Sequence, residues 1–195
     1  MSKKTNSIII KTVVIVVLLV SLVAYTYRSF VPNLIPIVSN IDGKEYMVQN
    51  YPDKQVASDN LSKMCARLNQ FINILYNEYP DDKRVQRLKN NFKCSKIKEG
   101  NGSMGQTSYT VEKGKSMVLC MRDKNKNLHQ ANVLTFVTIH ELSHIASESY
   151  GHNGEFRDNF KWLIEEAEAR NFYTHDSFDV DPENYCGIQI DAVPH

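Results

Sequence analysis

His140, Glu141 and His144 form a His-Glu-x-x-His pattern whose residue types and spacing suit metal chemistry. Residues four apart on an α-helix lie on one face, one turn apart, so the two imidazoles can bind a single ion. Glu141 lies at the edge of that face, where its carboxylate can reach a water molecule without binding the ion. The pattern predicts a Zn2+ site in which Glu141 is the general base of peptide-bond hydrolysis.

A catalytic zinc needs a third protein ligand and one open position. His152 is our first candidate because it follows Gly151, eight residues after His144. Gly151 is suited to end the helix in a left-handed conformation, which would turn the chain back toward the ion. Glu165 and Glu166 are the alternatives, since a glutamate of a downstream helix can also complete such a site.

The remaining histidines and several tyrosines carry weaker signals. Three lone histidines are expected at the surface: His129, His175 and His195. A second group that stabilises the oxyanion is usual in peptide hydrolysis. The sequence offers four tyrosines for this role without choosing among them: Tyr109, Tyr150, Tyr173 and Tyr185.

The four cysteines allow three complete pairings and have no CxxC spacing, which argues against a site made of cysteines alone. They are Cys65, Cys94, Cys120 and Cys186. Cys65 falls on an apolar helix face and Cys120 in an apolar strand, so both are expected to be buried thiols. Cys186 is expected to be packed or disulfide-bonded in a final strand.

Helices and one hairpin must position the motif. The apolar periodicity predicts four helices, at residues 58–80, 81–92, 132–151 and 154–172, the third of which carries His140 and His144. Ser58 or Asp59 could cap the first helix, and Asp81 or Asp82 the second. Two β-rich runs around the turn Glu112-Lys113-Gly114-Lys115 predict a hairpin over residues 107–123, and residues 44–51 a short strand. This combination indicates an α+β fold.

The N-terminal part differs in character from the rest of the chain. Residues 8–27 are almost purely apolar apart from Lys11, which predicts an uncleaved transmembrane helix. Lysines before this segment outnumber the basic residues after it, which predicts a cytosolic N-terminus and a domain on the lumenal or extracytosolic side. We therefore expect a stub and anchor at 1–28, a stalk at 29–43 and a zinc metallopeptidase domain at 44–195.

Composition and charge limit the class of partner. The 195 residues are 42% hydrophobic and 23% charged, with a net charge of +1 and interspersed signs. This is typical of a globular domain, and it lacks the basic stripe of nucleic-acid-binding proteins. The expected partners are a protein or peptide substrate and a membrane, with no nucleic acid.

The segment His-Glu-Leu-Ser-His, followed by Gly-His-Asn-Gly-Glu-Phe ending at Phe156, resembles zinc peptidases of the WLM and SprT-like group. Over residues 41–191 the chain is also similar to small membrane-anchored metallopeptidases of large DNA viruses. The resemblance implies a zincin-type minimal fold, with His140, His144 and His152 as ligands and Glu141 as base. Some members of the group clear DNA–protein crosslinks, but this chain has no evident DNA-binding tail.

Two alternatives belong to other functional classes. The first is a membrane-tethered structural or adaptor protein, for example of a virion, with a structural or inactive zinc site. A fourth ligand such as Glu165, His175 or Cys186 would mark it. The second is a self-inhibited protease in which the thiolate of Cys186 covers the metal.

Overall fold

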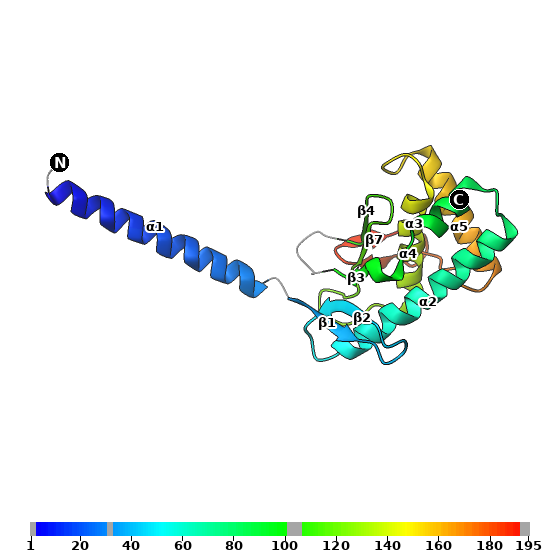
Figure 1. Ribbon diagram of the computed structural model, residues 1–195, viewed down its shortest axis with the longest axis horizontal. Helices are drawn as coiled ribbons and strands as arrows, with labels where there is room; N and C mark the ends of the chain where they lie inside the picture. Colours follow the sequence, from blue (N-terminus) through cyan, green and yellow to red (C-terminus); the bar gives the residue numbers. More distant parts are fainter. Residues whose placement is uncertain (1–2, 31–32, 101–106, 192–195) are drawn as a thin grey trace. The chain divides into compact units, whose positions relative to one another are not determined.

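A computed structural model describes residues 3–30, 33–100 and 107–191 (Figure 1). The chain divides into two units, residues 1–33 and 34–195. The first unit holds helix α1, Lys3–Phe30, and the second holds all other described helices and strands. Helices and small sheets follow one another along the second unit, so the predicted α+β class is confirmed.

Helix α1 is long, but it does not meet the requirement for a membrane span. In the part of the chain that the structure describes, no helix combines the length and the apolar character needed to cross a bilayer. The predicted transmembrane anchor is therefore wrong, and so is the single-pass localisation that depended on it.

The second unit begins with two paired strands. Strand β1, Leu34–Val38, pairs antiparallel with β2, Glu45–Gln49, in the register Leu34↔Gln49 to Val38↔Glu45. The predicted strand at 44–51 is thus confirmed, whereas the predicted stalk at 29–43 contains a strand. Pro36 is compatible with β1 because this strand lies at a sheet edge, where a missing N–H is tolerated.

Helix α2, Lys54–Glu78, begins four residues before its predicted start. Asp59 does not cap it, because its carboxylate accepts hydrogen bonds from Ser39 Oγ at 2.8 Å and from the Asn40 N–H at 2.7 Å. Asp59 therefore ties the helix to the turn after β1. Helix α3, Lys83–Asn91, starts as predicted, with Asp82 accepting from the Arg84 N–H at 2.8 Å.

A three-stranded sheet with the order β3-β5-β4 faces the helices. Strands β4, Tyr109–Val111, and β5, Ser116–Leu119, form the predicted hairpin, with Val111 opposite Ser116. Strand β3, Ile97–Glu99, follows the short 3-10 helix η1, Cys94–Lys96, and pairs parallel with β5. The sequence did not predict β3, because three residues are too few for a recognisable alternation.

Helices α4, Ala131–Ala146, and α5, Gly154–Ala169, carry the motif and the segment after it. Helix α4 ends five residues before Gly151, where the sequence placed its end. The Glu155 carboxylate accepts hydrogen bonds from the backbone N–H groups of Glu148 at 2.7 Å and Ser149 at 2.9 Å. These two N–H groups therefore do not form the hydrogen bonds that would continue the helix. Gly151, with φ 80°, lies within the following loop.

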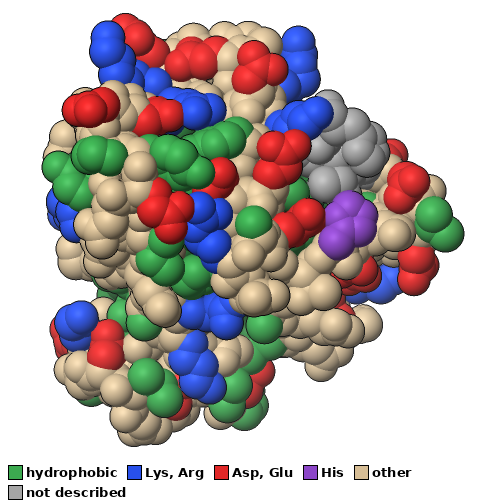
Figure 2. Space-filling view, turned by 90° about the vertical axis from the view of Figure 1, so that its right-hand side faces the viewer, with side chains coloured by type: hydrophobic (Ala, Val, Ile, Leu, Met, Phe, Trp, Pro, Cys, Tyr) green, Lys and Arg blue, Asp and Glu red, His purple; other side chains and the backbone are tan. Residues whose placement is uncertain are grey.

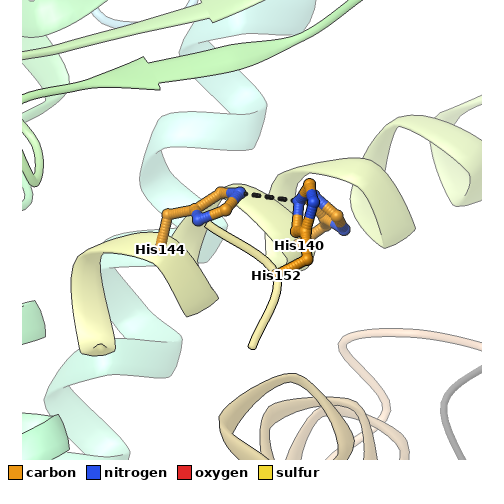
Figure 3. Close-up of side chains that lie close together, drawn as sticks. All are labelled: His140, His144 and His152. Atoms are coloured by element: carbon orange, nitrogen blue, oxygen red, sulfur yellow. Dashed lines mark hydrogen bonds between the residues drawn. The ribbon is translucent and has the colours of Figure 1, made fainter. Parts of the chain in front are cut away.

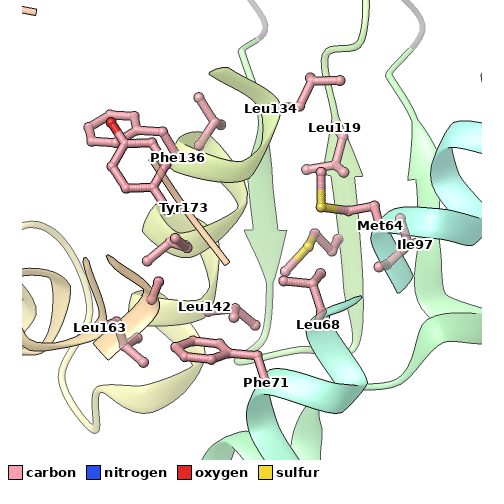
Figure 4. Packing of buried hydrophobic residues seen from close by; sticks show 14 of the residues in the cluster. Met64, Leu68, Phe71, Ile97, Leu119, Leu134, Phe136, Leu142, Leu163 and Tyr173 are labelled. Atoms are coloured by element: carbon pink, nitrogen blue, oxygen red, sulfur yellow. The ribbon is translucent and has the colours of Figure 1, made fainter. Parts of the chain in front are cut away.

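Apolar side chains from α2, α4, α5 and the sheet fill one core (Figure 4). Leu142 of α4 is fully buried on the side of that helix that faces this core. Packing of this kind fixes how α4 is rotated about its axis, and hence where its histidines point. The core residues that Figure 4 labels are Met64, Leu68, Phe71, Ile97, Leu119, Leu134, Phe136, Leu142, Leu163 and Tyr173.

Two disulfides staple this unit. Cys65 of α2 bonds to Cys94 of η1, and Cys120 after β5 bonds to Cys186. Cys186 lies between β6, Glu183–Tyr185, and β7, Ile188–Ile190, which form an antiparallel pair. The predicted buried thiols at Cys65 and Cys120 are wrong in their chemistry, because sequence spacing does not reveal which cysteines become neighbours in space.

Figure 2 shows one face of the molecule, on which Lys and Arg side chains are interspersed with Asp and Glu side chains. This face therefore has no extended area of a single charge. The same mixing is visible along the sequence, where the net charge is +1.

Candidate metal centre

His140, His144 and His152 bring their imidazoles together (Figure 3). The Nε2 atom of His152 lies 3.0 Å from that of His140 and 3.1 Å from that of His144. The three ligand atoms lie within 4.8 Å of one another, so this cluster could hold a metal ion. The structure thus joins the two α4 histidines to the loop histidine that the sequence analysis favoured.

The aromatic ring of Phe156 lies close to all three imidazole rings. Its ring centroid lies 4.8 Å from that of His140, 4.4 Å from His144 and 4.6 Å from His152. Phe156 is placed in the first turn of α5, where its N–H donates to the Asn153 side chain at 3.1 Å. A buried ring in this position restricts the orientations of the imidazoles, which is a requirement for a preorganised ligand set.

Several contacts hold the loop that carries His152. Arg157 Nη1 donates to the His152 carbonyl at 3.0 Å, and Arg87 Nε donates to the last carbonyl of α4, that of Ala146, at 2.5 Å. Glu155 holds the two N–H groups described above and also accepts from Ser149 Oγ. The third imidazole is therefore delivered by a loop with defined hydrogen bonds at both ends.

Burial keeps the α4 imidazoles neutral. It lowers the pKa of His140 to about 3, and the neighbouring His144 and His152 lower it further. Burial likewise lowers the pKa of His144 to about 4, with additional effects of His152 and Lys113. Neutral imidazoles with free lone pairs are the form that binds a metal ion, so these donors fit a metal at neutral pH.

Glu141 is only 2% exposed and lies beside β4. Burial raises the pKa of its carboxyl group to about 7, although the nearby side chain and backbone of Thr110 act in the opposite direction. Within the described chain, neither Glu141 Oε2 nor Thr110 Oγ1 has a hydrogen-bond partner of good geometry. Buried oxygens of this kind need a partner, so they can accept from or donate to a bound molecule.

A cleft of about 410 Å³ is lined by the three clustered histidines and Glu141. Thr110 and Lys113 of the β4–β5 hairpin and Ile188 of β7 contribute to its walls. The sequence analysis missed these three residues, because nothing in the chain indicates how close they come to the motif. Of the predicted oxyanion candidates, Tyr109 and Tyr150 line the cleft, whereas Tyr173 and Tyr185 are buried in the core.

The alternative ligands lie outside the histidine cluster. Glu166 pairs with Arg170 at 2.5 Å, and His175 pairs with Glu168 at 2.9 Å. Glu165 is exposed on α5 and does not belong to the histidine cluster. Cys186 is disulfide-bonded, so it has no thiolate to cover a metal and the self-inhibition hypothesis is wrong.

The remaining lone histidines also lie outside the cluster. His129 is half-buried rather than exposed, and its ring centroid lies 4.9 Å from that of Tyr185 with the two rings tilted. His175 is exposed, as predicted. His195 falls outside the described residues.

A protein of a large virus resembles this chain over most of its length. An uncharacterized protein of Acanthamoeba polyphaga mimivirus is 30% identical over 191 residues, which cover 95% of this chain and 97% of that protein. This chain belongs to the same family as the mimiviral protein. The resemblance to viral proteins that the sequence suggested is thereby confirmed, although the match carries no activity, because the mimiviral protein is itself uncharacterized.

Two further viral proteins match shorter parts of the chain. An uncharacterized protein of Invertebrate iridescent virus 6 is 35% identical over 85 residues, 42% of this chain and 46% of that protein. One of Invertebrate iridescent virus 3 is 37% identical over 89 residues, 43% and 51% of the two chains. No protein-family model matches the chain.

Among solved structures, two crystal structures of Wss1 from Saccharomyces cerevisiae, one of them a mutant, share part of the fold. Each has a TM-score of 0.48 and 18% sequence identity. The match covers 64% of this chain and 88% of the first structure, and 65% and 91% for the mutant. A similarity of this degree does not by itself identify a function.

Proposed function

We propose that this chain is a zinc-dependent peptidase that hydrolyses protein or peptide substrates. The observation that carries this proposal is the convergence of His140, His144 and His152 beside the buried carboxylate of Glu141. Three histidines with an adjacent carboxylate and an open cleft are the donor set of catalytic zinc sites.

The donor set fits zinc. Nitrogens that bind one tetrahedral zinc at about 2.0–2.1 Å lie about 3.3 Å apart, which is close to the 3.0 and 3.1 Å between the Nε2 atoms here. When bound, zinc would supply a Lewis acid that acidifies water and polarises a carbonyl oxygen. His140, His144 and His152 would hold it through Nε2.

Glu141 would act as the general base and then as the general acid. Its Oε2 has no hydrogen-bond partner in the described chain, so it can accept a proton from the water that attacks the scissile carbonyl carbon. The same oxygen can then give the proton to the leaving amine. Thr110, on the adjacent strand, lines the cleft beside this carboxyl group and partly offsets the rise of its pKa.

A structural zinc site is the competing proposal, and the geometry supports it less well. A structural site is closed by a fourth protein ligand. Among the residues that the structure describes, only three side chains of the ligand types His, Cys, Asp and Glu form the cluster. Of the candidates for a fourth ligand, His175 pairs with Glu168, Cys186 is disulfide-bonded and Glu165 lies outside the cluster. A buried Glu141 would have no role in a structural site.

The test is metal content and peptide hydrolysis of the full chain. Wild type should bind one zinc per chain and cleave peptides. Glu141→Gln should keep the zinc and lose at least a hundredfold in kcat, because proton transfer contributes roughly 10²–10⁴-fold.

His152→Ala should lose both zinc and turnover. His175→Ala is the matched control, because His175 is exposed and outside the cluster, and it should behave as wild type. Full activity of Glu141→Gln would contradict the mechanism, and a wild type without zinc would contradict the metal site.

A further inference from the structure

The turn between β4 and β5 holds two non-glycine residues in a left-handed backbone conformation. Glu112 has φ 42° and Lys113 has φ 54°, and the Gly114 N–H donates to the Val111 carbonyl at 3.1 Å to close the turn. Each such residue destabilises the backbone by about 1–2 kcal/mol. Strain of this kind persists where surrounding contacts hold it, often at a binding site.

The contacts of Lys113 lie at the metal centre. Its Nζ donates to the Ser149 carbonyl and lies 4.5 Å from the centroid of the Tyr150 ring. Both residues belong to the loop that delivers His152. The left-handed turn therefore directs this side chain across the cleft instead of into open solvent.

Lys113 is the cationic side chain of this cleft. Of the described residues that line it, only Lys113 and Glu141 are of a type that carries a full charge, apart from the histidines of the cluster. Burial lowers the pKa of Lys113, and the negative charge of Glu155 offsets this effect only in part. Among the described carboxylates, none forms an ion pair with its Nζ.

An ammonium group in this environment favours an anionic partner. It has three N–H donors, of which the Ser149 carbonyl takes one. A carboxylate that enters the cleft could accept from the others, and charge-assisted hydrogen bonds in partly desolvated sites are stronger than those in water. Ser149 and Tyr150 also hold the ammonium in place, so little conformational entropy is lost on binding.

We propose that Lys113 is a specificity-determining residue that binds a carboxylate of the substrate near the bond to be cleaved. This inference rests on the proposed peptidase function. Peptides offer two sources of a carboxylate: the side chain of Asp or Glu, and a free C-terminus. Lys113 would select substrates that place either group at a fixed distance from the scissile bond.

The experiment uses the zinc-loaded full chain and a pool of synthetic peptides. Each peptide is prepared with a free and with an amidated C-terminus, and cleavage sites are read by mass spectrometry. Lys113→Met removes the charge and Lys113→Arg keeps it. Lys115→Met is the matched control, because Lys115 lies in the same turn but is exposed and pairs with Glu112 at 3.1 Å.

Wild type and Lys115→Met should favour Asp or Glu over Asn or Gln at one fixed position by roughly tenfold in kcat/KM, as expected for a charge-assisted contact. Enrichment of free over amidated peptides cleaved near their ends would instead identify the terminal carboxylate as the source. In both cases Lys113→Met should lose the preference and Lys113→Arg should retain most of it.

Binding provides a second readout. In the Glu141→Gln background, the Kd of the preferred peptide should rise about tenfold on Lys113→Met, and that of its neutral counterpart should not change. An equal loss for acidic and neutral peptides would overturn the inference, since it would mean that Lys113 only holds the loop. Equal cleavage of all peptides by wild type would overturn it too, while leaving the peptidase function intact. If zinc-loaded wild type hydrolyses no peptide, the proposed function fails and this inference fails with it.

Discussion

At the scale of single residues, the carboxylate of Glu155 decides where the third imidazole lies. It accepts hydrogen bonds from the N–H groups of Glu148 and Ser149 and lies 3.7 Å from Arg87. These contacts lower the pKa of Glu155 to about 2, first through the Ser149 hydroxyl and then through the two backbone groups. Helix α4 ends at Ala146, and the N–H groups of Glu148 and Ser149, which would continue it, donate to this side chain instead.

Glu155→Gln should therefore destabilise the fold. A depressed pKa means that the stabilisation is present above the unfolded value near 4.5 and is lost as the pH falls toward about 2. We expect a loss of about 1 kcal/mol in the free energy of unfolding at pH 6, after allowing for solvent screening of a side chain that is 35% exposed. Urea denaturation at pH 6 and pH 3 should show the difference from wild type shrinking at the lower pH.

Glu148→Gln is the control for this effect. Its side chain is 87% exposed and lies as far as 4.0 Å from Arg87, so it contributes little to stability. Its backbone N–H, which donates to the Glu155 carboxylate, is unchanged by the substitution. This variant should unfold as wild type does at both pH values. A difference between wild type and Glu155→Gln that stays constant with pH would show that the carboxylate charge is not the cause.

At the scale of elements, the β4–β5 hairpin is positioned by close contact with the end of α3. Gly114 has φ 109°, and a Cβ at this position would lie 2.8 Å from the Asn91 carbonyl oxygen. That atom belongs to the backbone, so it cannot move aside at low cost. The close approach of Gly114 to Asn91 fixes the position of the turn, and with it the position of Lys113 at the cleft.

Gly114→Ala should lower the free energy of unfolding by about 2 kcal/mol or more, because it adds backbone strain to a steric clash. The metal-bound protein should also lose part of its selectivity, since the turn would shift. Gly154→Ala is the matched control: its Cβ would meet no atom within 4 Å, and it lies at the start of α5 without a positive φ. Thermal unfolding of both variants is the measurement, and equal midpoints would contradict the steric argument.

At the scale of the whole second unit, covalent and metal links join segments that are distant in sequence. Cys120–Cys186 connects residues 66 apart, and Cys65–Cys94 connects residues 29 apart. The proposed zinc would add a third link between α4 and the loop after it. Such links restrict the unfolded chain more than the folded one.

Removing the longer link should have a large effect. By the chain-entropy relation, a closed loop of this length contributes about 4 kcal/mol. The double variant Cys120→Ala/Cys186→Ala should therefore unfold at a clearly lower urea concentration than wild type under non-reducing conditions. If both proteins unfold at the same concentration, the disulfide does not form in the purified protein.

Zinc should stabilise the fold by mass action. At a free concentration 100 times the Kd, the gain is about 2.7 kcal/mol. The melting temperature should accordingly rise by several degrees with zinc and fall with a chelator. His144→Ala should abolish this response, and His175→Ala should keep it. An identical melting temperature of wild type with and without chelator would count against a metal that is coupled to folding.

The sequence determined the local features of this protein. A four-residue spacing on an apolar-faced helix is enough to place His140 and His144 on one side, and Asp82 caps α3 through a contact two residues away. The hairpin turn and the α+β class also follow from short-range patterns. Each of these depends on neighbours within a few residues, for which sequence spacing is a direct measure of distance.

Only the tertiary structure decided the long-range features. Three features join residues whose separation in sequence says nothing about their separation in space: the pairing of Cys120 with Cys186, the parallel partner of β3, and the approach of Lys113 to the histidine cluster. The predicted membrane anchor is wrong, because no helix in the described part of the chain is long and apolar enough to cross a membrane. His152 lies between these cases: its spacing indicated a ligand, but the folded loop and the Glu155 carboxylate bring its Nε2 within 3.1 Å of both partners.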